Sequence, residues 1–267
     1  MYSHFKLGLK YLQYLFIASN SKGHGIHSPF VFEFVEQVLL IENSKKDVFK
    51  KIEDIRHGYA TDKNRFIEVQ DLGAGSVSKS GTRRSVAHIT KGAAKRPKFA
   101  RLLHRLVEYY HVTSVLELGT SLGLTTRYLA SVSEKVKVLT IEGAPGIADF
   151  TRRAFVEEGF KNIELVTGSF DTKLPEAISK MKGKKLVFFD GNHQYQPTLD
   201  YFELVLMSVD EEDILVFDDI HWSEGMENAW EEIKKNERVT CSIDLFFIGI
   251  VFLKKEFKEK LDFTIRF

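Results

Sequence analysis

A glycine-containing turn in the middle of the chain has the residue types needed to bind a nucleotide-like cofactor. The segment VLELGTSLGLTTRYLA (115–130) begins as an apolar strand and passes an acid and two glycines before an apolar helix. Glycine at such positions permits a tight turn and a close approach of backbone to ligand. An acid before the first glycine would repel a pyrophosphate but suits an adenosyl ligand with an α-ammonium group. We expect cofactor contacts from Glu117, Gly119, Thr120, Ser121 and Gly123.

The ends of the next two expected strands supply further cofactor candidates. Glu142 follows Gly119 by 23 residues, close to the spacing of about 20 at which an acid accepts hydrogen bonds from ribose hydroxyls. With its neighbour Gly143 it is expected to hold the ribose, although a solvated acid at a strand end is the simpler alternative. Ser169 and Phe170 precede a helix after the third strand and could flank an adenine, and Asp190, at the end of the strand after that, is a further cofactor-binding candidate.

Three aspartates follow two later apolar runs, Asp190 after one and Asp218 and Asp219 after the other. The carboxyl ends of parallel strands converge on one crevice. Three carboxylates there repel one another unless protons or a cation intervene, and their oxygens suit Mg²⁺ or Ca²⁺. We therefore expect a metal site at Asp190, Asp218 and Asp219, with Mg²⁺ as the candidate ion. Alternatively, Asp190 binds substrate or orders a loop, and the paired aspartates cap the next helix.

A histidine close to Asp190 is the candidate general base. His193 lies three residues after Asp190, and an imidazole can take a proton from a hydroxyl at neutral pH. Asp190 and His193 are thus the expected catalytic pair, with a purely structural histidine as the alternative. His221 and Trp222 follow the paired aspartates and rank below His193 as contacts to the acceptor.

The pattern of the second part of the chain is typical of a doubly wound α/β sheet. Short β-branched or aromatic runs alternate with helical stretches such as 122–131, 146–158 and 198–207, which indicates repeated βαβ units. The last two strands are nearly continuous, so they should form an antiparallel hairpin. Seven strands are expected, at 114–118, 136–141, 163–166, 186–189, 214–217, 240–245 and 247–253.

The first 95 residues are expected to form a helical cap or lid on a domain that spans 96–267. Helical patterns cover 2–18, 29–40 and 97–110, and a polar stretch with glycines covers 58–95. Within that stretch DLGAGS (71–76) imitates a cofactor turn, but the strand before it is poor and a polar run follows, so we reject it as the primary loop. In HGIHSPFVF (24–32), we expect Phe30 and Phe32 to pack in the core, and His24 or His27 is a minor candidate for the acceptor pocket.

Composition indicates a soluble globular protein that we expect in the cytoplasm. The chain has 267 residues, of which 43% are hydrophobic, and no apolar run approaches the roughly 18 to 20 residues of a membrane span. The start lacks the apolar core of a signal peptide. A single cysteine, Cys241, excludes an internal disulfide and is expected to be a buried apolar group. Residues 1–111 carry 19 Lys and Arg against 10 Asp and Glu, which could attract an anionic substrate or nucleic acid or simply face an acidic region.

Taken together, these motifs resemble the class I S-adenosylmethionine-dependent methyltransferases, and within them the small O-methyltransferases of the catechol and caffeoyl-CoA type. The likeness covers about residue 96 to the end and includes FFDGNHQY (188–195) and VFDDIHW (216–222). It implies a seven-stranded sheet with an antiparallel last strand, and cofactor contacts from Glu117, Gly119, Gly123, Glu142 and the region of Ser169. In the catechol-type enzymes the metal ligands are Asp and then Asp-Asn, so Asp219 stands where Asn is usual, and His193 stands in place of a catalytic lysine.

The expected function is methyl transfer from S-adenosylmethionine to a hydroxyl of a small molecule. A tRNA or rRNA methyltransferase is an alternative that the basic first part favours, although no N-P-P-Y-type motif or RNA-binding module is present. An NAD-dependent oxidoreductase is less suitable because Ser121 and Leu124 occupy two glycine positions of the G-x-G-x-x-G fingerprint. A cofactor-binding protein without turnover is the last alternative. We expect no membrane partner and leave a homodimer open.

Overall fold

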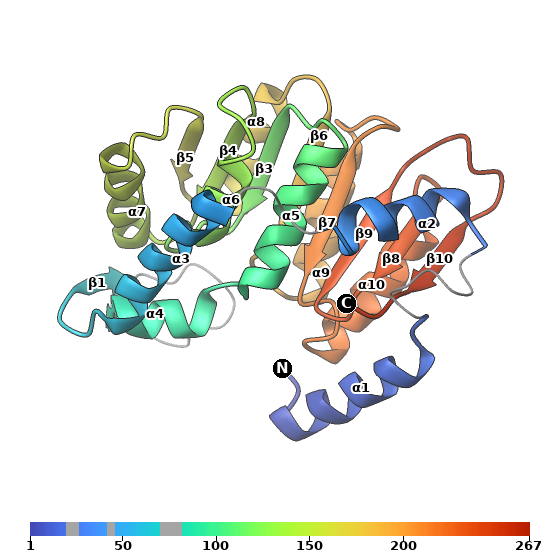
Figure 1. The fold of residues 1–267 in the computed structure, drawn as a ribbon, viewed down its shortest axis with the longest axis horizontal. Helices are drawn as coiled ribbons and strands as arrows, with labels where there is room; N and C mark the ends of the chain where they lie inside the picture. Colours follow the sequence, from blue (N-terminus) through green and yellow to red (C-terminus); the bar gives the residue numbers. More distant parts are fainter. Residues whose placement is uncertain (20–26, 42–45, 70–81) are drawn as a thin grey trace. The chain divides into compact units, whose positions relative to one another are not determined.

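The computed structural model describes residues 1–19, 27–41, 46–69 and 82–267, and these form two compact units (Figure 1). The central unit comprises residues 43–183. The terminal unit combines residues 1–42 with 184–267. A domain boundary at residue 95 stays a prediction.

Three parallel strands form the sheet of the central unit. They are β3 (Ser114–Leu118), β4 (Lys137–Glu142) and β5 (Ile163–Thr167), with β4 between the other two. The strand β3 is buried throughout, as expected for a parallel strand that is covered on both faces. In register, Leu118 lies opposite Ile141, and Glu142 lies opposite Thr167. The carboxyl ends of all three strands therefore meet at one edge.

The helices of the central unit bury apolar stripes around these strands. Leu102, Leu103 and Leu106 of one such stripe are fully buried, as the three-to-four spacing of the sequence predicts. The helices of this unit are α3 (Lys46–Thr61), α4 (Val86–Ala93), α5 (Pro97–Tyr109), α6 (Leu124–Ala130), α7 (Pro145–Glu157) and α8 (Phe170–Lys180).

A two-stranded antiparallel hairpin in the central unit was not expected. It pairs β1 (Phe66–Val69), which the sequence indicated only as a poor strand, with β2 (Thr82–Ser85), which lies in the stretch indicated as polar. Ile67 and Val69 point inward and share a buried cluster with Leu122 and Ala144. Alternation of apolar and polar residues over four positions was too short a signal to separate this strand from a loop.

The terminal unit contains five strands in the order β10-β8-β9-β7-β6, which are β6 (Lys185–Phe189), β7 (Ile214–Asp218), β8 (Cys241–Asp244), β9 (Ile248–Phe252) and β10 (Leu261–Thr264). β9 runs antiparallel to both β7 and β8, which confirms the expected hairpin. The doubly wound, mostly parallel architecture is confirmed, but the strand count of the main sheet was wrong. With β3 to β5 there are eight such strands and not seven, because β10 was missed. β10 has four residues, of which three are only partly buried, and it lies next to a charged stretch, so its apolar signal is weak.

Helices cover both faces of the terminal sheet (Figure 1). Trp230 of α10 (Glu224–Lys235) packs against Phe217 and Gly249, and α9 (Tyr195–Leu206) lies beside α10. Phe30 of α2 (Pro29–Phe34) packs against Phe252, which points to the other face because it is an odd number of positions from Gly249. A π-helical segment η1 (Val35–Leu39) follows α2, and α1 (His4–Ile17) begins the chain. In the described part of the chain, no helix has the length and apolar character that a membrane crossing requires.

Several local expectations can be compared with the structure. Cys241 is fully buried, as predicted, and burial raises the pKa of its thiol to about 12. Phe30 packs on two aromatic rings as predicted, whereas the prediction for Phe32 was wrong: its side chain is 40% exposed because α2 turns Val31 and Phe34 inward instead. His24 and the segment 71–76 lie outside the described residues.

Candidate active site

Glu142 connects the three strand-end loops of the central unit. Its Oε2 accepts a hydrogen bond from the Ser121 amide at 2.8 Å, and its Oε1 accepts one from the Ala144 amide at 2.9 Å. Its backbone carbonyl accepts a bond from the Gly168 amide at 2.9 Å. The loops after β3, β4 and β5 are thus fixed to one residue. Each carboxylate oxygen has two lone pairs and can accept more than one hydrogen bond.

The turn after β3 has the backbone geometry for which glycine is needed. Gly119 and Gly123 have φ values of 108° and 69°. A Cβ atom on Gly123 would lie 2.4 Å from Cζ of Phe155 on α7, so the helix packs directly on this position. Ser121, which is not glycine, also has a positive φ of 47°. Its amide bond to Glu142 and the bond from Thr151 Oγ1 to its carbonyl at 2.8 Å stabilise this conformation.

A buried arginine that the sequence analysis missed supports the same turn. Arg127 is fully buried, and its Nη1 donates to the Leu122 carbonyl at 2.8 Å. Its Nε and Nη2 form a bidentate pair with Glu158 at 2.7 and 2.6 Å. A buried charge of this kind requires such a partner. Arginine in the first turns of a helix was the visible signal, but the partner 31 residues later was not deducible from the sequence.

Glu117 is a fully buried carboxylate between β3, α6 and β4. Its Oε2 accepts hydrogen bonds from Thr126 Oγ1 at 2.5 Å and from Thr140 Oγ1 at 2.7 Å. Thr140 Oγ1 also lies 2.7 Å from Thr120 Oγ1, which extends the polar chain into the glycine turn. Glu117 is therefore linked to the glycine turn through the hydroxyls of Thr140 and Thr120.

The remaining cofactor candidates of this unit lie at the same edge. Gly143 follows Glu142 directly and is partly buried. Ser169 precedes α8 as its N-cap residue but makes no side-chain capping bond, and its Oγ lies 3.1 Å from Thr172 Oγ1. Phe170 opens α8 and is also partly buried. The structure thus places Thr120, Ser121, Glu142, Gly143, Ser169 and Phe170 on neighbouring loops.

In the terminal unit the ends of β6 and β7 bring two aspartates and a histidine together. Phe189 lies opposite Phe217 in the parallel register, so Asp190 and Asp218 come next at the same edge. One ligand atom each from Asp190, His193 and Asp218 lies within 4.8 Å of the others, and His193 Nε2 is 3.8 Å from Asp190 Oδ1. A cluster of two carboxylates and an imidazole can hold a divalent ion. The nitrogen donor suits Mn²⁺ or Zn²⁺ better than Mg²⁺, which prefers oxygen ligands.

Asp219 and His221 have other surroundings than the sequence analysis assumed. Asp219 does not belong to this three-residue group, and its backbone has a positive φ of 53° while its amide donates to the Phe247 carbonyl at 2.8 Å. His221 Nδ1 lies 2.9 Å from Glu227 Oε1, and Nε2 lies 2.8 Å from Asp244 Oδ2. Burial lowers the pKa of His221, but the hydrogen bonds and charges of Asp244 and Glu227 outweigh burial and raise it above the usual value. Both ring nitrogens of His221 are therefore engaged within the protein.

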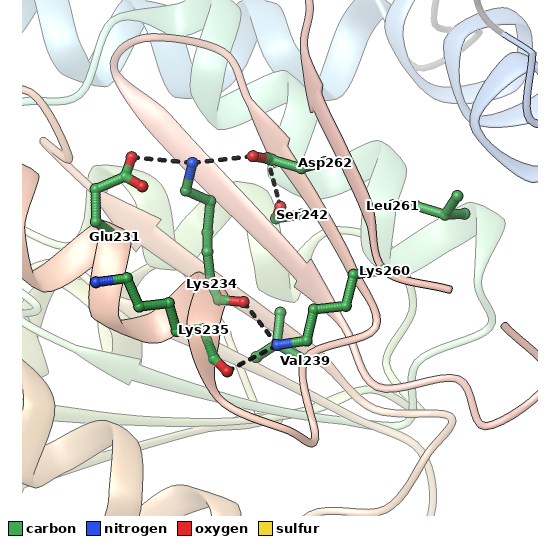
Figure 2. Close-up of a pocket in the computed structure, with 8 residues that line it drawn as sticks. All are labelled: Glu231, Lys234, Lys235, Val239, Ser242, Lys260, Leu261 and Asp262. Atoms are coloured by element: carbon green, nitrogen blue, oxygen red, sulfur yellow. Dashed lines mark hydrogen bonds and ion pairs between the residues drawn. The ribbon is translucent and has the colours of Figure 1, made fainter. Parts of the chain in front are cut away.

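A hollow of about 450 Å³ in the terminal unit lies away from this cluster. Figure 2 shows partners for two of its lysines: Lys234 bridges Glu231 and Asp262, and Lys260 donates to carbonyls at the end of α10. Ser242, which lines the hollow, is the second residue of β8. The first residue of β8, Cys241, and the first residue of β7, Ile214, both lie opposite Phe252 of β9, so the starts of β7 and β8 are at the same end of the sheet. The hollow is therefore at the opposite end of the strands from Asp218.

One family model matches the segment that contains both the strand-end loops of the central unit and the cluster of Asp190, His193 and Asp218. Residues 116–220 match the model described as a methyltransferase domain. The match identifies residues 116–220 as a methyltransferase domain. This segment includes Glu117, Glu142, Asp190 and Asp218. Comparison with curated protein sequences gives no match.

Solved structures of methyltransferases have the same fold as this chain. A methyltransferase from Podospora anserina, PaMTH1, with bound S-adenosylhomocysteine has a TM-score of 0.58 and 11% identity, over 86% of this chain and 97% of that one. An O-methyltransferase from Bacillus cereus in complex with S-adenosylhomocysteine has a TM-score of 0.51 and 20% identity, over 84% and 97%. TomG from Streptomyces achromogenes, an O-methyltransferase of tomaymycin synthesis bound to S-adenosylmethionine, has a TM-score of 0.54 and 16% identity, over 84% and 96%. These identities establish the methyltransferase fold.

Proposed function

We propose that the protein transfers a methyl group from S-adenosylmethionine to a hydroxyl oxygen of a small molecule. The observation that carries the proposal is the connection of three strand-end loops through Glu142. Ligands of open α/β sheets bind in the crevice at the carboxyl ends of the strands. The similar structures from Bacillus cereus and Streptomyces achromogenes are O-methyltransferases with this cofactor or its product bound, which supports the choice of cofactor and of an oxygen acceptor.

In this proposal the central unit holds the cofactor. Glu142 accepts hydrogen bonds from the ribose hydroxyls at the carboxylate that also binds the Ser121 and Ala144 amides. Gly119 and Gly123 allow the backbone to approach the ligand, and Ser169 and Phe170 flank the adenine. Glu117 braces the turn through the hydroxyls of Thr126 and Thr140 and contributes negative charge near a cationic ligand.

The terminal unit would handle the acceptor. His193 takes the proton from the hydroxyl, so that the oxygen attacks the methyl group in line with its bond to sulfur, and Asp190 orients the imidazole. The donor set of Asp190, His193 and Asp218 also fits a divalent ion, which would polarise a bound hydroxyl. The two roles of His193 exclude each other on the same nitrogen. If His193 were a metal ligand, the ion would lower the pKa of the bound hydroxyl, and the proton would pass to solvent. Asp219, the third predicted metal ligand, lies outside this group of three residues.

A small-molecule acceptor is favoured over nucleic acid in this proposal. The positive charge of the first 111 residues was the feature that favoured tRNA or rRNA, while the similar solved enzymes named above are O-methyltransferases. A homodimer, and a cap that ends at residue 95, are retained as proposals for solution studies.

Calorimetry with S-adenosylhomocysteine and with NAD tests the cofactor assignment. We expect micromolar binding of the first and none of the second, because Ser121 and Leu124 replace two glycines of the dinucleotide turn. A mass-spectrometric screen of small-molecule extracts with S-adenosylmethionine then identifies methylated products. Binding of NAD with no binding of S-adenosylhomocysteine would overturn the proposal, as would methylation of RNA alone.

A further inference from the structure

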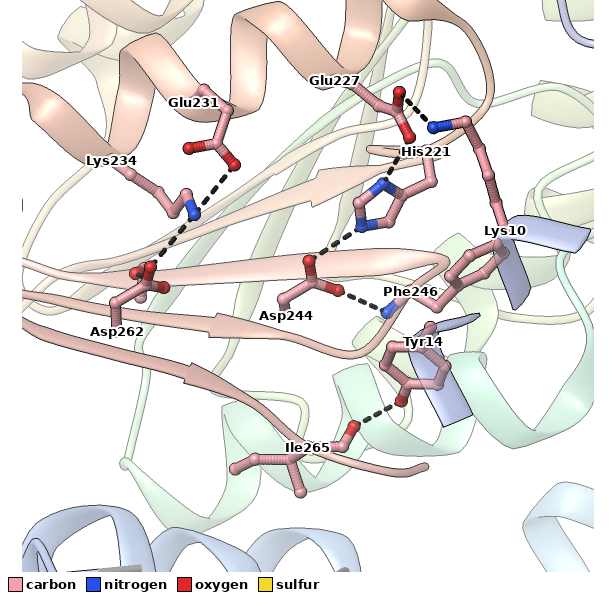
Figure 3. A network of polar contacts seen from close by, with 11 residues as sticks. Lys10, Tyr14, His221, Glu227, Glu231, Lys234, Asp244, Phe246, Asp262 and Ile265 are labelled. Atoms are coloured by element: carbon pink, nitrogen blue, oxygen red, sulfur yellow. Dashed lines mark hydrogen bonds and ion pairs between the residues drawn. The ribbon is translucent and has the colours of Figure 1, made fainter. Parts of the chain in front are cut away.

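The first helix is attached to the terminal unit through one face (Figure 3). Lys10 Nζ forms an ion pair with Glu227 Oε2 at 2.8 Å, and Tyr14 donates from its hydroxyl to the Ile265 carbonyl. The ring of Tyr14 also packs against Phe246, at 5.3 Å between centroids. These contacts determine which side of α1 faces the protein.

The opposite face of α1 is a continuous apolar stripe. Phe5, Leu9, Leu12 and Phe16 follow one another at spacings of four, three and four residues, which places them in line along a helix. Their side chains are between 52% and 85% exposed. Together they present roughly 500 Å² of apolar surface, in the range of the largest patches on monomeric proteins, which usually have a function.

Positive charge accompanies this apolar stripe. Residues 1–32 contain Lys6, Lys10 and Lys22 but no aspartate or glutamate. Lys6 is exposed beside the stripe, with its ammonium 4.1 Å from the Tyr2 ring centroid. Lys10 is neutralised by Glu227, so Lys6 is the lysine of α1 that remains for a partner. A second copy of this helix would bring like charges together, whereas an anionic surface complements them.

In contrast to the expectation from the sequence, we propose that the outward face of α1 docks on an anionic lipid surface. The helix has 14 residues, or about 21 Å, and would lie in the plane of the lipid headgroups with the stripe directed toward the acyl chains. Lys6 would reach the phosphates from the edge of the stripe. The contacts of Lys10 and Tyr14 keep the stripe directed away from the protein, so docking requires no rearrangement of α1.

Sedimentation of the full-length protein with vesicles tests this inference. We expect binding to phosphatidylcholine vesicles that contain phosphatidylglycerol, weaker binding to phosphatidylcholine alone, and loss of binding as salt screens the charges. Phe5→Ser with Phe16→Ser should reduce the partition coefficient at least about tenfold, because two large apolar side chains no longer leave water. Lys6→Glu should weaken binding to the anionic vesicles while the stripe is intact.

A matched control removes two other exposed apolar side chains. Val156 and Met207 are 73% and 76% exposed outside α1, so Val156→Ser with Met207→Ser should bind vesicles like the unchanged protein. Light scattering of the same variants measures the mass in solution. A dimer that dissociates in the Phe5 and Phe16 variant would overturn the proposal in favour of a second copy, and equal binding to neutral and anionic vesicles would overturn the role of charge.

Discussion

The amide of Ser121 donates to the Glu142 carboxylate at 2.8 Å, so a residue in the turn after β3 is fixed by a side chain from the end of β4. This bond explains how a serine keeps a positive φ in a turn where glycine would be easier. It also means that Glu142 would have two roles in cofactor binding, contact and loop support.

Replacement of Glu142 should separate these two roles. Glu142→Ala removes both the acceptor for the ribose and the bond to Ser121, and charge-assisted hydrogen bonds contribute about 1.5 to 3 kcal/mol each, so calorimetry should show at least a tenfold loss of S-adenosylmethionine affinity. Glu142→Gln retains one oxygen and should lose less. Glu164→Gln, an exposed acid on β5 paired with Lys180, and Glu68→Ala should stay within about threefold of the unchanged protein. Unchanged affinity in Glu142→Ala would reject the site.

The sequence predicted the central strands and their loops well, because both signals are local. The acid and glycines of 117–123 and the acid at the end of the next strand are visible as a pattern, and the strands around them are strongly apolar. The bonds from Ser121 to Glu142 and from Arg127 to Leu122 were not predictable, since they depend on how separate elements pack.

The elements and contacts that the sequence analysis missed also depend on how separate elements pack. The strands β1 and β10 have four residues each and derive their stability from neighbours that are distant in sequence, so intrinsic propensity indicated β1 only as a poor strand and did not reveal β10. His221 appeared to be free for substrate because Glu227 and Asp244, which occupy its nitrogens, come from α10 and β8.

Gly123→Ala should lower the free energy of unfolding of the central unit by more than the backbone strain of alanine alone would. Alanine at a φ of 69° is strained by about 1 to 2 kcal/mol, and its Cβ would also contact the Phe155 ring. Gly159→Ala is the matched control, because Gly159 has a φ of 80° with open space around it and shares only the backbone strain. Urea unfolding should show a larger loss for Gly123→Ala, and Phe155→Leu should recover part of the difference. Equal losses would mean that the ring moves aside freely.

Removal of divalent ions tests the cluster of the terminal unit. If Asp190, His193 and Asp218 bind a metal, a chelator should abolish methyl transfer, and Mn²⁺ or Zn²⁺ should restore it better than Mg²⁺. Asp218→Asn should weaken metal binding and lower activity together, while Asp200→Asn, an exposed acid on α9, should change neither. Full activity of the chelated protein would exclude a metal role.

Replacement of His193 distinguishes a base from a structural residue. His193→Ala should reduce kcat by about 10² to 10⁴ if the imidazole accepts the proton. Cofactor affinity should remain nearly unchanged, because the residues proposed to bind it belong to the central unit. A parallel loss of rate and affinity would show that the histidine only supports the fold.

The last prediction concerns the pH dependence of stability through His221. Its folded-state pKa is raised, because hydrogen bonds and charges from Asp244 and Glu227 outweigh the opposing effect of burial. A raised pKa favours the folded state fully below the unfolded value near 6.5, and this contribution disappears as pH rises through the folded value. His221→Gln should therefore lower the free energy of unfolding by about 1.5 to 3 kcal/mol near pH 6, and by less near pH 9, as measured by urea unfolding.

His88→Gln, at an exposed position of α4, should show the pH profile of the unchanged protein. Lys10→Met should weaken the attachment of α1, because Lys10 no longer pairs with Glu227. The pH dependence of stability should remain, because Asp244 still pairs with His221. A difference between the unchanged protein and His221→Gln that grows with pH would contradict the assignment of a protonated His221.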